Sequence, residues 1–141
     1  MKTLRSGNNN TMFIESPKKT ISKGNKEVFT FLTDLKNFEQ LMPENIDKFE
    51  VLNNDRFLFA LKGMPEIVLE RKAQTEFNQL VLGAASEKLP FTLTADIAAI
   101  GETESEVTLS FSGEFNAMMA MMIKSPITNF MKTLSENLNK I

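Results

Sequence analysis

The sequence predicts an α+β fold in which one long C-terminal helix lies across an antiparallel sheet. From Ala117 to Ile141, apolar residues recur at steps of three and four, the spacing of a helix that buries one face. Between Phe49 and Gly113, short runs alternate apolar and polar residues, which is typical of strands with one covered face. The helix is the only predicted element long enough to cover such a sheet.

The composition favours a single domain with no cofactor. A chain of 141 residues is enough for one core, and we expect a disordered tail over 1–11 and one domain over 12–141. The chain has no His and no Cys, so disulfides, thiolate metal sites and His-dependent catalysis are excluded. We predict no catalytic residue, no metal site and no cofactor.

The net charge and the hydropathy pattern limit the classes of partner that we expect. The net charge is −2, which is unfavourable for a nucleic-acid backbone, so we expect no nucleic-acid partner. The first ten residues are polar and do not resemble a secretory signal, and no apolar run approaches the length of a membrane span. We therefore expect a cytoplasmic protein with no integral membrane segment, and we leave weak homodimer formation open.

The N-terminal third predicts an edge strand followed by two short helices. Met12 to Ser22 reads as an edge strand, because Pro17 cannot donate to a central ladder. Glu27 to Leu32 has helical spacing, with Gly24 or Asn25 before it as a cap. A second helix should begin near Asp34 and end at Pro43.

In the middle of the chain, apolar residues recur at every second position, which predicts about six strands. With the N-terminal edge strand, we expect a sheet of about six to seven strands. The Asn-Asn-Asp turn at 53–55 should join the first two as a hairpin. The predicted strands are Phe49 to Leu52, Phe57 to Leu61, Glu66 to Ala73, Phe77 to Gly83, Thr92 to Ile100 and Glu106 to Gly113. The segment from Ala84 to Pro90 reads as a loop, and Pro126 should kink or split the terminal helix.

This order of elements, together with the stretch from Val28 to Pro43 and the terminal helix, resembles the Bet v 1/START-like superfamily, also called SRPBCC or polyketide cyclase-like proteins. The resemblance covers about Phe13 to Ile141. It implies a helix-grip fold, in which a curved sheet wraps around the long helix and encloses an apolar cavity. Proteins of this kind bind lipids, sterols, polyketides or hormones, and some are enzymes.

Candidate ligand-binding residues follow from the pattern and the resemblance together. They are Phe38, Leu41, Met42, Phe57, Phe59, Leu69, Arg71, Phe91, Leu93, Phe111, Met118, Met119, Met122 and Phe130. The methionines suit an adaptable binding surface, although Met also fills irregular cores. Arg71 is in register with Ile67 and Leu69 and could meet a ligand carboxylate, or it could reach solvent from the end of its strand.

We expect the first of three functions, without enzymatic activity, and keep the other two as alternatives. The first is binding or transport of a small hydrophobic, lipid-like or polyketide-like molecule in a cavity between the sheet and the C-terminal helix. The second is a polyketide cyclase-type enzyme, which would require a titratable group facing the cavity. The third is a protein-interaction module, which would have a filled core and an exposed apolar patch.

Overall fold

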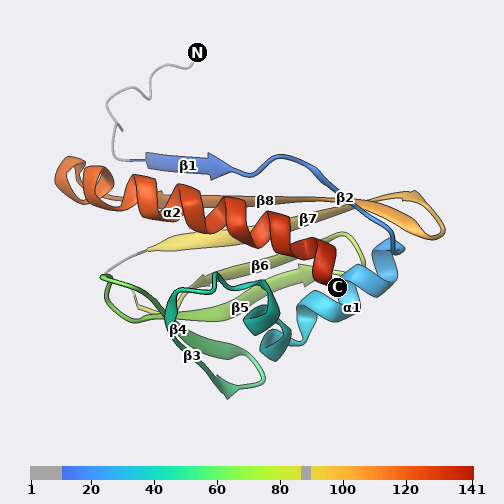
Figure 1. Cartoon of the computed structure of the whole chain (residues 1–141), viewed down its shortest axis with the longest axis horizontal. Helices are drawn as coiled ribbons and strands as arrows, with labels where there is room; N and C mark the ends of the chain where they lie inside the picture. Colours follow the sequence, from blue (N-terminus) through green and yellow to red (C-terminus); the bar gives the residue numbers. More distant parts are fainter. Residues whose placement is uncertain (1–10, 87–89) are drawn as a thin grey trace, which may run out of the picture.

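The computed structural model describes residues 11–86 and 90–141 as a curved antiparallel sheet with a long helix along its concave face (Figure 1). The strands are β1 (Thr11–Glu15), β2 (Lys19–Ile21), β3 (Ile46–Asn53), β4 (Arg56–Leu61), β5 (Ile67–Thr75), β6 (Gln79–Ala84), β7 (Phe91–Gly101) and β8 (Glu104–Glu114). The helices are α1 (Asn25–Thr33), the 3₁₀ helix η2 (Leu35–Leu41), α2 (Ala117–Asn137) and the 3₁₀ turn η3 (Leu138–Lys140). This is the predicted helix-grip arrangement. The predicted tail lies outside the described residues except for Thr11, which begins β1.

Every neighbouring pair of strands in the sheet is antiparallel, in the order β1-β8-β7-β6-β5-β4-β3. The predicted edge strand is divided into β1 and β2, both of which pair with β8. Ser16 stands at the break, where its amide donates to Leu109 O at 2.8 Å and its hydroxyl accepts from Leu109 N at 3.0 Å. Pro17 follows without an amide hydrogen, so the break falls where the ladder loses a donor.

The two predicted short helices are present and close one end of the concave face. Val28, Phe29 and Leu32 are the buried side of α1, and Gly24 occupies its N-cap position in an extended conformation. The second helix is 3₁₀ rather than α, and its buried residues Leu35, Phe38 and Leu41 pack on the core. Met42, before Pro43, is extended, as the steric effect of the proline requires.

The predicted hairpin joins β3 to β4, and Asp55 N donates to Asn53 Oδ1 at 2.8 Å within its turn. The predicted alternation is confirmed in β8 and in β7 from Leu93 to Ile97, where buried apolar residues alternate with more exposed ones, but the end of β7 from Ala98 to Ile100 is exposed on both faces. Turns and loops make up the remaining described residues. In the predicted loop from Ala84 to Pro90, Ala84 belongs to β6 and residues 87–89 lie outside the described part of the chain.

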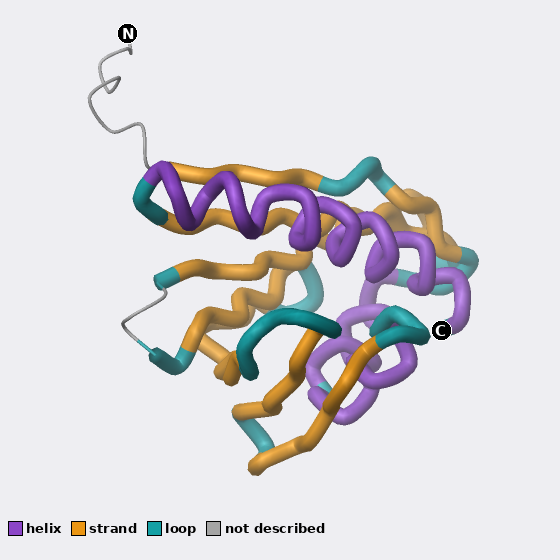
Figure 2. The backbone as a smooth tube through the Cα atoms, turned by 60° about the vertical axis from the view of Figure 1, so that its left-hand side comes forward, coloured by secondary structure: helices purple, strands orange, loops and turns teal. Residues whose placement is uncertain are grey.

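The terminal helix α2 is continuous through Pro126, so the proline does not split it. Figure 2 shows it running along the strands as one helix. Its N-cap is Asn116, whose side chain accepts from Met119 N at 2.8 Å. The fully buried residues of α2, from Ile127 to Ser135, lie in its C-terminal half, whereas Met119, Ala120 and Ile123 of the other half are only partly buried against the core. No helix in the described part of the chain is long and apolar enough to cross a bilayer.

Candidate functional site

The N-terminal half of α2 is separated from the sheet by an open, largely apolar cleft of about 660 Å³. Four parts of the chain that are distant in sequence surround it: the ends of β7 and β8, the turn from β4 to β5, the segment between η2 and β3, and α2 itself. Its lining residues are Pro43, Asn45, Leu61, Lys62, Gly63, Met64, Pro65, Ile67, Phe91, Phe111, Phe115, Met119, Met122, Ile123, Pro126, Ile127, Asn129, Phe130 and Thr133.

Three aromatic rings form the sheet side of the cleft. Phe91 of β7 lies 4.9 Å from Phe111 of β8 between ring centroids, and Phe111 lies 6.1 Å from Phe115. Gly113 makes this arrangement possible, because a Cβ there would come within 2.7 Å of Phe91 Cβ and 2.9 Å of Phe115 Cε2. The absence of a side chain at Gly113 therefore leaves the space that the rings of Phe91 and Phe115 occupy.

The turn between β4 and β5 forms the opposite wall. Gly63 has a φ of 84°, which favours glycine, and Met64 N donates to Leu61 O at 2.9 Å. This tight turn places Met64 and Ile67 against the same space as α2.

The roof of the cleft is one stripe of α2. Met119, Met122, Ile123, Pro126, Ile127 and Phe130 succeed one another at alternating steps of three and one residues, so that they share one face of the helix, and all line the cleft. Met122 is 66% exposed to solvent, so part of the roof is open. The roof therefore combines fixed residues near Phe130 with exposed, flexible ones near Met122.

Polar groups are few. Among the described residues of the lining, Lys62 is the only ionisable side chain, and Asn45, Asn129 and Thr133 are the only other polar ones. Just outside, Lys48 Nζ is 3.0 Å from Glu66 Oε2, and this hydrogen bond raises the pKa of Lys48. The chemistry that the cleft offers is thus apolar contact with a small polar margin.

Comparison with known proteins finds similarity in structure alone. No protein-family model matches the chain, and no curated protein matches its sequence. Norcoclaurine synthase from Thalictrum flavum, solved with a transition-state analogue, superposes with a TM-score of 0.71 at 9% identity, covering 92% of each chain. A START superfamily protein from Mycobacterium smegmatis gives a TM-score of 0.68 at 9% identity, covering 91% of this chain and 94% of that one.

A protein from Thermus thermophilus gives 0.69 at 12% identity, covering 92% of this chain and 95% of that one. The chain has the Bet v 1/START-like fold. At these identities the likeness shows the fold and no more.

Within this START-like fold, the predicted site residues separate into groups. Phe91, Phe111, Met119, Met122 and Phe130 line the cleft. Phe38, Leu41 and Leu93 surround a void of only about 10 Å³ beneath α1 and η2, which is too small for a ligand. Met42, Phe57, Phe59 and Leu69 belong to the packed core, and Met118 is 73% exposed and does not line the cleft.

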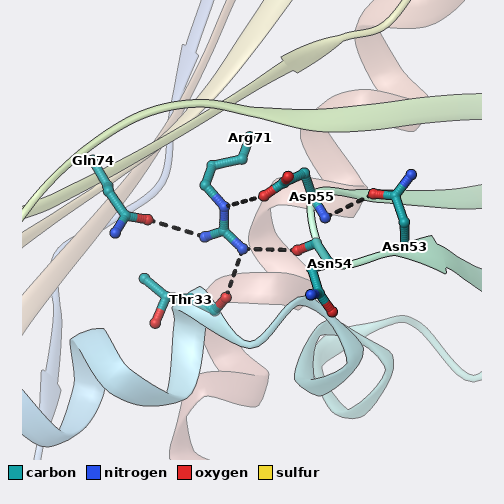
Figure 3. A network of polar contacts seen from close by, with 6 residues as sticks. All are labelled: Thr33, Asn53, Asn54, Asp55, Arg71 and Gln74. Carbon is teal, nitrogen blue, oxygen red and sulfur yellow. Dashed lines mark hydrogen bonds and ion pairs between the residues drawn. The ribbon is translucent and has the colours of Figure 1, made fainter.

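Arg71 does not line the cleft either, and the reason is visible in its contacts (Figure 3). Its Nε donates to Asp55 Oδ1 at 3.0 Å, and one terminal nitrogen donates to Gln74 Oε1 at 3.0 Å. The other donates to Thr33 O at 3.0 Å and Asn54 O at 2.9 Å. The guanidinium thus joins the end of α1 to the β3–β4 turn, and these protein groups occupy the donors that a ligand carboxylate would need.

Sequence reasoning missed several lining residues. Ile123 and Ile127 belong to the helical stripe that predicted α2, and Phe115 continues the period of Phe111 and Gly113, so these could have been chosen. The turn around Met64 carried a turn signal, but nothing local indicates that it folds beside α2.

Proposed function

We propose that this protein binds a small hydrophobic molecule in the cleft between α2 and the sheet. The observation that carries the proposal is the cleft itself, about 660 Å³ in volume and lined mainly by Phe, Met, Ile and Pro side chains. Small-molecule sites in proteins span about 300–1,000 Å³ and have mostly apolar walls. Each square ångström of apolar surface removed from water would contribute about 25 cal/mol.

The side chains of the roof suit a ligand of variable shape. Met119 and Met122 sit on α2 opposite the rings of Phe91, Phe111 and Phe115. Methionine is unbranched and polarizable, and it adapts to the surface it covers. Rigid rings on one side and adaptable thioethers on the other support a site that accepts a class of apolar molecules.

The structural neighbours support the same proposal at the level of the fold. Norcoclaurine synthase has been solved with dopamine and hydroxybenzaldehyde bound, so this fold can hold small aromatic molecules in that protein. The low identity transfers neither those ligands nor that reaction.

The two alternative functions have less support. An acid–base enzyme would have to work from the cleft with exposed Lys62 as the only ionisable side chain among the described lining residues. A protein-interaction module agrees with the exposed Met118, Met121 and Met122, but it predicted a filled core, and the cleft argues against that.

Native mass spectrometry of protein purified without detergent tests the proposal. We expect a stoichiometric apolar adduct, or uptake of one molecule from a panel of fatty acids, sterols and aromatic polyketides. Solvent extraction of the adduct then identifies its class. A protein that is ligand-free as purified and takes up nothing from the panel would contradict the proposal.

A further inference from the structure

The cleft is apolar at one end and polar at the other, and this asymmetry bears on the ligand. On the basis of the proposed function, we infer that the ligand is a monoanionic amphiphile, with an apolar chain under the N-terminal half of α2 and a carboxylate held by Lys62. The chemical class is that of a fatty acid.

The polarity changes along α2. Its lining residues are apolar from Met119 to Ile127, and Asn129 and Thr133 follow, with only Phe130 between them. At 1.5 Å of rise per residue, Met119 and Thr133 are about 21 Å apart along the helix axis. An extended apolar chain with one polar end matches this gradient.

The sheet side supplies its polar groups at the same end. Ile46 pairs with Leu61, so Asn45 and Lys62, the next residues outward on each strand, lie at one end of the β3–β4 pair. Asn137, one turn beyond Thr133, donates to Leu41 O at 2.9 Å, which fixes this part of α2 beside the segment that leads into Asn45. Asn45, Lys62, Asn129 and Thr133 therefore face one region of the cleft.

Lys62 supplies the positive charge there. It is exposed, and within the described part of the chain it has neither a hydrogen bond nor an ion pair. The nearby carboxylate of Glu66 is already bound by Lys48 at 3.0 Å. No carboxylate is found among the described residues of the lining.

One uncompensated cation favours an anion with one charge. The amides of Asn45 and Asn129 and the hydroxyl of Thr133 can donate further hydrogen bonds to a carboxylate. A multiply charged headgroup would find only one cation, so a carboxylate suits this end better than a phosphate monoester.

The experiment compares probes that share a chain and differ in the headgroup: dodecanoic acid, dodecanol and dodecylamine. Their affinities are measured at pH 8 by displacement of Nile red from the intact protein. We expect the acid to bind about fivefold more tightly than the alcohol, because an exposed ion pair contributes about that much to affinity. The amine should bind most weakly. The preference should shrink as salt is added.

Variants assign the effect to Lys62. Lys62→Met should remove the preference for the acid over dodecanol, and Lys62→Arg should keep that preference. Lys124→Met is the matched control, since Lys124 is an exposed lysine of α2 that does not line the cleft.

The outcomes separate the two proposals. Equal affinities for acid and alcohol, or a preference that survives in Lys62→Met, would overturn the carboxylate assignment while the apolar site stands. Failure of Nile red and of all three probes to bind would overturn both.

Discussion

Phe59 of β4 and Phe130 of α2 stack nearly parallel, with ring centroids 5.2 Å apart and an interplanar angle of 6°. Phe130 also lines the cleft, whereas Phe59 lies in the core, 6.0 Å from the ring of Phe57. Phe57 in turn stacks on Phe38 at 5.3 Å. One series of rings thus runs from the inner end of the cleft to η2, so the contact that holds the helix on the sheet also marks the boundary between cleft and packed core.

We predict that Phe130→Ala lowers the free energy of unfolding by about 3–5 kcal/mol, because it removes a buried ring and its stacking on Phe59. Urea unfolding followed by circular dichroism measures the loss. Met121→Ala, at an 82% exposed position of the same helix, is the control and should change stability by less than about 0.5 kcal/mol. Equal effects of the two changes would mean that the ring stack does not hold α2.

Arg71 is predicted to matter for stability and not for ligand binding. Arg71→Met would remove the donor of the partly buried Thr33 O and the ion pair with Asp55, and should cost about 1–2 kcal/mol, although water can replace the donor at the exposed Asn54 O. Arg56→Met is a suitable comparison, because Arg56 is half exposed and forms an ion pair with only Glu70 among the described residues, so its loss should cost less than about 1 kcal/mol. Nile red affinity should be unchanged in both. Weaker Nile red binding by Arg71→Met at unchanged stability would indicate that Arg71 belongs to the ligand site after all.

The elements of the fold could be predicted because their signals are local. Period two in β7 and β8, the Asn-Asn-Asp turn and Pro43 each specify their own segment without reference to distant residues. The break between β1 and β2 was not predicted: Pro17 indicated an edge strand, but the bonds that join Ser16 to Leu109 of β8 link residues distant in sequence.

The site could be predicted only in part, because a cleft is a relation among distant segments. The pattern placed Phe57 and Phe111 on the same covered face, which is where they lie, but it could not tell that η2 and α2 fill the space around Phe57 and leave it open near Phe111. The pattern likewise placed Arg71 on the same face as Leu69. It could not show that the guanidinium of Arg71 donates hydrogen bonds to the end of α1 and to the β3–β4 turn.

Gly113 gives a prediction about the shape of the cleft. Gly113→Ala should cost about 1–3 kcal/mol, because the new methyl group would overlap Phe91 and Phe115 and force them apart. Since both rings line the cleft, Nile red affinity should change as well.

Gly101→Ala is the matched control, as a Cβ there meets no atom of the described residues within 4 Å. It should leave binding unaffected and alter stability by less than about 0.5 kcal/mol. If Gly113→Ala also changed neither stability nor Nile red affinity, the positions of Phe91 and Phe115 would not depend on a glycine at 113.

Two neighbouring methionines of α2 give the sharpest test of the cleft. Met122 lines it and Met121 does not, yet both are largely exposed, at 66% and 82%. Met122→Asp should therefore cost less than about 1 kcal/mol of stability, as expected for an exposed position. It should nevertheless weaken Nile red binding on the order of tenfold, because a bound apolar molecule would strip water from the carboxylate. Met121→Asp makes the same chemical change one residue away and should bind the dye like the unmodified protein. Equal weakening by the two substitutions would point to an effect on the helix as a whole, and no weakening by either would place apolar binding elsewhere on the molecule.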